Sequence, residues 1–193
     1  MEKIYHFVTN NNAWNDGFFF HSNYFVNENA FLYAFLTALG IGVAVAAIFY
    51  FGFCNGKTAK YATHSNWFIV LILACVTAYF ASNVVYIGGQ KLDDNGNEVS
   101  STGFYKSCKE HYMKKIEEPE FADNEEQGRT LLSKHNDIIT ALRQRQDVAF
   151  PFNTTNTVIS LFAFIIASFG IKNFTKHGSA IPLKVRNLLN FKK

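Results

Sequence analysis

The sequence predicts an all-α membrane protein with three transmembrane helices and an amphipathic, mostly helical extramembrane loop between spans two and three. The first observation is three apolar runs without Asp, Glu, Lys, Arg or His, at Ala30–Phe53, Trp67–Ile87 and Phe150–Ile171. About twenty apolar residues cross a hydrocarbon core of roughly 30 Å, so each run is long enough to span it. The second is that all 15 acids precede Asn29 or lie between Gln90 and Phe150, and the other polar stretches carry only basic residues.

These runs divide the 193 residues into seven segments. They are an aromatic-rich interfacial N-terminal segment (1–29), a first span (30–53), a short basic loop (54–66), a second span (67–89), an extramembrane helical lobe (90–149), a third span (150–171) and a basic C-terminal tail (172–193). The first segment mixes aromatic rings, Tyr5 and Phe25 among them, with polar residues, so we expect it on the outer surface or packed under the lobe. The alternative is an ordered strap that binds a partner. It lacks the basic start and apolar middle of a secretory signal, which indicates that the first span stays in the mature protein.

Small residues recur at helical spacing in each span, and in lipid such stripes let helices approach closely. They are Ala34, Ala38, Gly42 and Ala46 in the first span, Ala74, Ala78 and Ser82 in the second, and Ser160, Ala163, Ala167 and Gly170 in the third. The stripes predict helix packing. They leave open whether the partner helices belong to the same chain, to identical copies or to a different protein. Asn83, near the end of the second span, is expected to form a cap or an interhelical hydrogen bond.

The lobe begins with a turn signal, Asn95-Gly96, and then predicts two helices. A short basic helix covers Tyr105–Ile116, and a longer amphipathic helix begins at Asp123. Apolar residues of the longer helix follow three- and four-residue spacing, which makes them the predicted partner-binding face: Leu131, Leu132, Ile138, Ile139 and Leu142. Pro151 is expected at the start of the third span, where its missing N–H has no intrahelical partner. An alternative makes this run a surface or re-entrant segment.

Charge predicts the orientation. With three spans, the short loop and the tail lie on one side of the membrane and carry eight bases and no acid, whereas the other side holds ten bases and 15 acids. Basic residues near span ends favour the cytoplasm, so we expect the N-terminus outside and the C-terminus inside. The Asn-, Lys- and Phe-rich composition suggests an AT-rich genome. We expect a bacterial inner membrane, and viral or organellar membrane proteins of similar composition are the alternatives. Four bases of the tail are expected to face anionic lipid: Lys184, Arg186, Lys192 and Lys193. The alternatives are that the tail docks a cytoplasmic partner or that its charge serves only to orient the chain.

Motifs for chemistry are not found. The sequence has no HExxH, GxSxG, P-loop or dinucleotide fingerprint, so no catalytic, cofactor-binding or metal-binding residue is predicted. The spans also lack the ionisable residues that proton relays and most ion-coupled transporters place at membrane depth. One loose group on the outer side is the candidate for a membrane enzyme: Cys108, Glu110, His111 and Glu117.

These features favour a non-catalytic integral membrane subunit that assembles into a larger envelope complex, such as a secretion or injection apparatus. Its expected partners are membrane lipids and other membrane-protein subunits or identical copies, with no nucleic acid. A first alternative is a small homo-oligomeric pore or membrane-perturbing effector, with the Thr154–Thr157 and Ser160 face lining the path. The membrane enzyme is the second alternative.

Overall fold

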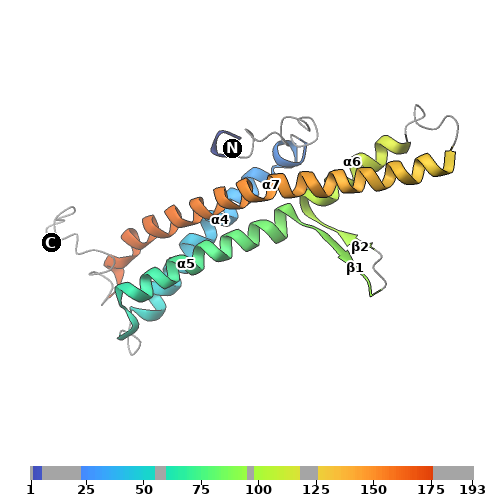
Figure 1. Ribbon diagram of the computed structural model, residues 1–193. Helices are drawn as coiled ribbons and strands as arrows, with labels where there is room; N and C mark the ends of the chain where they lie inside the picture. The colour runs from blue at the N-terminus through green and yellow to red at the C-terminus, as the bar shows by residue number, and fades with distance from the viewer. Residues whose placement is uncertain (1, 6–22, 55–59, 95–97, 118–125, 176–193) are drawn as a thin grey trace. The chain divides into compact units, whose positions relative to one another are not determined.

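The computed structural model describes residues 2–5, 23–54, 60–94, 98–117 and 126–175, and within helices α6 and α7 it describes the side chains of 103–110 and 146–171 only. The described chain is mostly helical (Figure 1). Its long helices are α4 (Ala30–Ala47), α5 (His64–Ala81), α6 (Gly103–Glu117) and α7 (Glu126–Ile171). Stretches of π-helix continue α4 through Ile48–Phe53 and α5 through Ser82–Ile87. Short helical turns lie at Glu2–Tyr5, Asn23–Asn27 and Lys172–Phe174.

Three of these helices are long and apolar enough to cross a membrane: Ala30–Phe53, His64–Ile87 and Gln146–Phe174. The first has the predicted bounds. The second begins three residues before the predicted Trp67, because the Thr63 hydroxyl accepts a hydrogen bond from the Asn66 backbone N–H at 3.2 Å and caps the helix there. Helix length and composition therefore agree with the three spans expected from the sequence.

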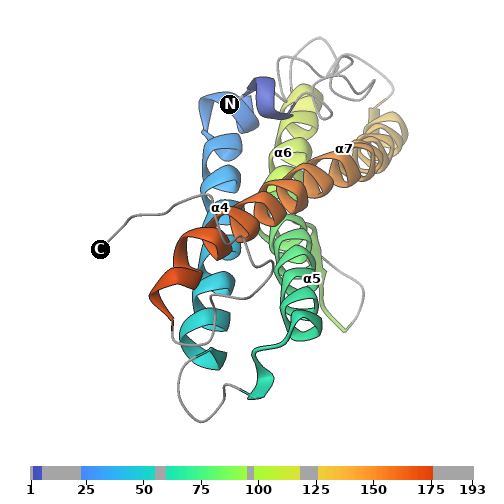
Figure 2. The ribbon, with the colours of Figure 1, turned by 90° about the vertical axis from the view of Figure 1, so that its left-hand side faces the viewer.

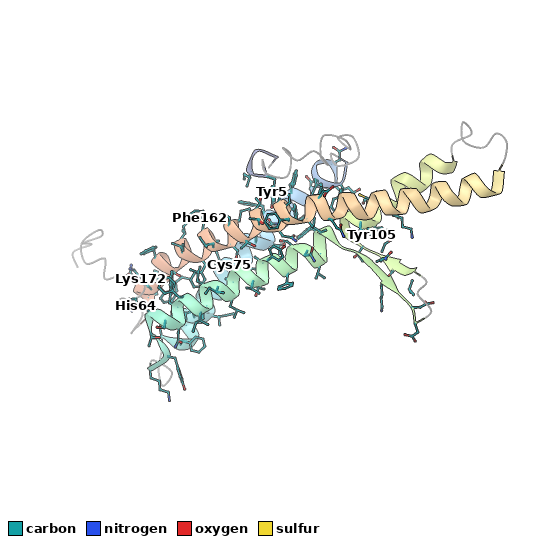
Figure 3. All side chains as sticks on the ribbon, in the orientation of Figure 1. Tyr5, His64, Cys75, Tyr105, Phe162 and Lys172 are labelled. Atoms are coloured by element: carbon teal, nitrogen blue, oxygen red, sulfur yellow. The ribbon has the colours of Figure 1, made fainter. Side chains whose placement is uncertain are left out.

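Large apolar side chains cover the outside of these helices. Exposed examples are Leu36, Ile48, Phe51, Phe68, Ile72, Val84, Phe162 and Ile166. Phe162, for example, points outward from α7 (Figure 3). Soluble proteins rarely expose contiguous apolar surface on this scale. The exposure is consistent with an integral membrane protein whose helices contact lipid.

The prediction that a helix starts at Pro151 is wrong, because α7 runs without a break from Glu126 to Ile171 and contains Pro151 (Figure 1). An interior proline removes one backbone hydrogen bond, which is why the sequence favoured a start there. Helical residues on both sides keep the rest of the ladder, and the Thr155 hydroxyl donates to the Pro151 carbonyl oxygen at 2.8 Å. The predicted lobe helix and the predicted third span are thus one helix.

The all-α prediction also needs correction, since a β-hairpin lies between α5 and α6. Strand β1 (Gln90–Leu92) pairs antiparallel with β2 (Glu98–Ser101), with Gln90 opposite Ser101 and an irregularity between Lys91 and Leu92. The Asn-Gly pair that signalled a turn lies between these strands, outside the described residues. A strand of three residues is too short to show a period of two, so the sequence pattern indicated the turn but not its strands.

The chain divides into two compact units, each described by itself below. Unit 1 combines Met1–Ala34 with Phe80–Thr155, and unit 2 combines Phe35–Tyr79 with Asn156–Lys193. Unit 1 thus brings together the N-terminal segment and the loop between spans two and three, the two polar parts that a three-span topology puts on one side of a membrane.

Candidate functional site

Five fully buried aromatic rings form the centre of unit 1, and we call them the aromatic cluster: Tyr5, Phe25, Phe31, Phe104 and Phe152. They come from the two N-terminal turns, the first residues of α4 and α6, and α7. Ring centroids lie 4.5 Å apart for Tyr5 and Phe31 and 5.3 Å apart for Phe25 and Phe152. Such pairs contribute about 0.5–1.5 kcal/mol each beyond their burial. Tyr5 of the first N-terminal turn lies beside Phe152 of α7, with ring centroids 5.4 Å apart (Figure 3).

Two tyrosines at the edge of the aromatic cluster bond to the end of the second apolar helix and to the hairpin. The Tyr24 hydroxyl donates to the Tyr86 carbonyl oxygen at 2.8 Å, and the Tyr105 hydroxyl donates to Gln90 Oε1 at 3.1 Å. Burial, followed by the nearby Glu28 charge, raises the pKa of the Tyr24 phenol above its usual range. The phenol therefore stays protonated and keeps its donor role at physiological pH.

A pair of glycines, which we call the glycine junction, joins the second apolar helix to α6. Gly88 and Gly103 both have positive φ, at 67° and 60°. A Cβ on Gly103 would lie 2.6 Å from the Tyr86 carbonyl oxygen and 2.9 Å from the Gly88 nitrogen, so the two backbones touch. Thr102 N donates to the Gly89 carbonyl oxygen at 3.0 Å beside them. The junction fixes where α6 and the hairpin leave the second apolar helix.

Asn83 forms the interhelical hydrogen bond that was one of its two predicted roles. Its Oδ1 accepts from Asn153 Nδ2 of α7 at 3.2 Å. In lipid such side-chain bonds contribute about 0.6 kcal/mol on average, because the separated helices also find polar partners. The bond links the end of the second apolar helix to α7 within unit 1.

The small-residue stripes are largely buried within this single chain. Ala34 and Ser82 are buried in unit 1, and Ala38, Gly42, Ala46, Ala74, Ala78 and Ser160 are buried in unit 2. Ala163 and Ala167 are half-buried, and Gly170 is exposed with nothing within 4 Å of its Cβ position.

Two helices of unit 2 approach closely at Gly42, where α7 crosses α4 (Figure 2). A Cβ on Gly42 would lie 2.8 Å from Ala163 Cβ and 2.9 Å from the Phe164 nitrogen, and closer still to the Ser160 carbonyl oxygen. For this residue, the partner helix is in the same chain.

A second contact in unit 2 joins α5 to α7, and the sequence analysis did not predict it. Trp67 Nε1 of α5 donates to Ser168 Oγ of α7 at 3.2 Å, and the Trp67 and Phe164 rings lie 5.4 Å apart. A buried core surrounds the pair and contains Ala46, Phe49, Tyr50, Cys54 and Ala74. Trp67 begins an apolar run and Ser168 interrupts another, but no spacing rule links residues so far apart in the chain.

The residues predicted for the alternative functions lie in different environments. Of the predicted pore face, Thr154 is exposed, whereas Thr155 bonds to the Pro151 carbonyl and Ser160 is buried beside Gly42. Of the candidate enzyme group, Cys108 is fully buried, and its burial raises the pKa of the thiol well above its usual range. A protonated thiol is a poor nucleophile. Glu110 is exposed and pairs with Lys106 at 3.8 Å, and the His111 and Glu117 side chains lie outside the description.

For two further sets of predicted residues, the structure describes no side chains. The partner-binding residues Leu131, Leu132, Ile138, Ile139 and Leu142 lie within α7, but their side chains are outside the described ones. The basic tail residues Lys184, Arg186, Lys192 and Lys193 lie beyond residue 175, where the description ends.

Among the side chains that the structure describes, no group of three or more His, Cys, Asp or Glu is placed to hold a metal ion. Comparison with known proteins finds no matching family model, no matching curated protein and no matching solved structure. The candidate function therefore depends on the helices, the aromatic cluster and the contacts of each unit.

Proposed function

We propose that the protein is a non-catalytic integral membrane subunit that presents a helical lobe outside the bilayer to other subunits of an envelope complex. The observation that carries the proposal is the division of the apolar helices into two kinds of surface. Small side chains are mostly buried inside the chain, and large apolar side chains are exposed. This is the arrangement expected of helices that pack on one another and face lipid.

The partner surface is assigned to the lobe because the helix-packing faces are largely occupied within the chain. Gly42 and Ser160 are buried against each other's helices, so they offer little surface to a second protein. The amphipathic part of α7 that precedes Gln146 lies outside the three candidate spans and carries the apolar set that includes Ile138 and Leu142. An amphipathic helix outside the bilayer needs a partner for its apolar face.

We further propose a bacterial inner membrane with the N-terminus and lobe outside and the basic tail inside. The support is the distribution of charge along the chain. The stretches at 54–66 and 172–193 contain eight bases and no acid. The enrichment of bases in short loops near span ends is the usual mark of the cytoplasmic side.

Labelling of single introduced cysteines tests this orientation. Lys91 in the hairpin and Lys60 in the short loop are both exposed. We expect a membrane-impermeant maleimide to label Lys91→Cys in intact spheroplasts, and to label Lys60→Cys only after lysis. The unsubstituted chain measures the background from its own cysteines, of which Cys54 and Cys108 are buried. Labelling of Lys60→Cys before lysis would reverse the orientation.

Copurification from native membranes tests the proposed role. After mild crosslinking, we expect the full chain to carry specific partners, and Leu142→Glu to lose most of them because a charge interrupts the apolar face. Gln144→Glu adds the same charge two residues further on, about 200° around the helix, so it should keep the partners. Both variants should remain in the membrane fraction. A wild-type chain recovered only as a monomer, or a Leu142→Glu variant with every partner retained, would contradict the proposal.

A further inference from the structure

An apolar groove lies in unit 2 between the end of the first apolar helix and the start of α5. It has a volume of about 270 Å³ and is lined by Phe49, Phe53, Tyr61, Asn66, Ile69 and Val70. Phe49 and Phe53 come from the π-helical end of the first candidate span, and Ile69 and Val70 come from the first turns of the second. The groove therefore lies where the first candidate span ends and the second begins, next to the short basic loop.

The one amide among the lining side chains is already bonded to the loop. Asn66 Nδ2 donates to the Tyr61 carbonyl oxygen at 2.7 Å, and the Asn66 backbone N–H is bonded to the Thr63 hydroxyl. These bonds fold residues 61–66 against the first turn of α5 and leave aromatic and aliphatic carbon to line the groove. Such a lining suits a hydrocarbon chain.

A cation stands beside this hydrocarbon surface. Lys60 is exposed, and its Nζ lies 4.9 Å from the centre of the Tyr61 ring, within the range of a cation–π contact. The 54–66 stretch contains no Asp or Glu, so no nearby carboxylate in that loop competes for the Lys60 charge. A ligand of this site needs an apolar chain and a negatively charged head close to each other.

We propose that the groove binds an anionic phospholipid, with one acyl chain against Phe49, Phe53 and Ile69 and its phosphate beside Lys60. The proposal rests on the proposed function, because such a lipid reaches the groove only if the spans lie in a bilayer. Its occupant is the lipid rather than free phosphate, since an inorganic anion makes no use of the aromatic lining.

Native mass spectrometry of the full chain in detergent tests the charge requirement. Dioleoyl phosphatidylglycerol and dioleoyl phosphatidylcholine are added separately, and the fraction of chains that retains each lipid is measured. We expect phosphatidylglycerol to be retained preferentially, and Lys60→Gln to lower the preference about fivefold, as expected for loss of one cation at a membrane surface. Equal retention of the two lipids by the wild type, or displacement of phosphatidylglycerol by excess inorganic phosphate, would overturn the site.

Filling the groove tests its position with a matched control. Ile69 lines the groove and Ile72 does not, although their side chains are 61% and 60% exposed on the same helix. We expect Ile69→Trp to lose phosphatidylglycerol retention and Ile72→Trp to keep it. Resistance to alkaline extraction separates the two proposals. A chain that resists extraction but retains no phosphatidylglycerol overturns the lipid site alone, whereas a chain that is extracted overturns the membrane role as well.

Discussion

Replacement of Gly103 by alanine is expected to lower the free energy of unfolding by roughly 3 kcal/mol or more, because two separate penalties add. The backbone has φ of 60°, a region that residues with a Cβ seldom adopt. The added methyl group would also lie 2.6 Å from the Tyr86 carbonyl oxygen. The Tyr86 carbonyl oxygen and the Gly88 nitrogen, the two nearest atoms, are backbone atoms, so they cannot move aside as the end of a flexible side chain could. Thermal unfolding in detergent, followed by circular dichroism, measures the loss.

A second substitution separates the two penalties at this position. Asparagine tolerates positive φ better than alanine does, so Gly103→Asn relieves the backbone strain but keeps the Cβ contact. If close approach dominates, as we expect, the two variants are similarly unstable. Gly52→Ala is the control, because nothing lies within 4 Å of the Cβ position there. A stable Gly103→Ala variant would mean that α6 can leave the second apolar helix along another path.

The sequence predicted the apolar helices well because a helix suited to cross a bilayer is free of charge along its whole length. That requirement leaves a continuous record in the sequence, and the helix at Ala30–Phe53 is long and apolar enough to cross a membrane. The small-residue stripes leave a similar record through their regular spacing. Where a rule acts on every turn of a helix, a single sequence is enough to detect it.

Features that depend on a single distant contact were missed. The bond between Trp67 and Ser168 joins residues 101 positions apart, and neither residue is unusual in its own helix. The glycine junction was missed for the same reason, since Gly88 and Gly103 look like ordinary loop glycines until the chain brings them together. Pro151 was placed at a helix start because local propensity ignores the helical residues that continue on both sides.

Replacement of two glycines of α4 by alanine is expected to change the free energy of unfolding in opposite directions. Gly42 touches the backbone of α7, so an added methyl group must push α4 and α7 apart, at a cost of about 1–3 kcal/mol. Nothing lies within 4 Å of the Cβ position of Gly40. There the methyl group only limits the freedom of the unfolded backbone, which stabilises a helix by up to about 1 kcal/mol. Unfolding of the purified variants in detergent, titrated with sodium dodecyl sulfate, compares the two directly.

Comparison of the Gly42→Ala and Gly40→Ala variants also tests whether the small-residue stripe of α4 packs against α7. Separation of α4 from α7 should disturb the neighbouring contact between Trp67 and Phe164, so we expect Trp67 fluorescence to change in Gly42→Ala and not in Gly40→Ala, each on a Trp14→Phe background. If instead both alanine variants stabilise the protein, Gly42 cannot be in contact with α7. Its stripe would then be free to pack against another chain, and the partner surface proposed for the lobe would have to extend to α4 as well.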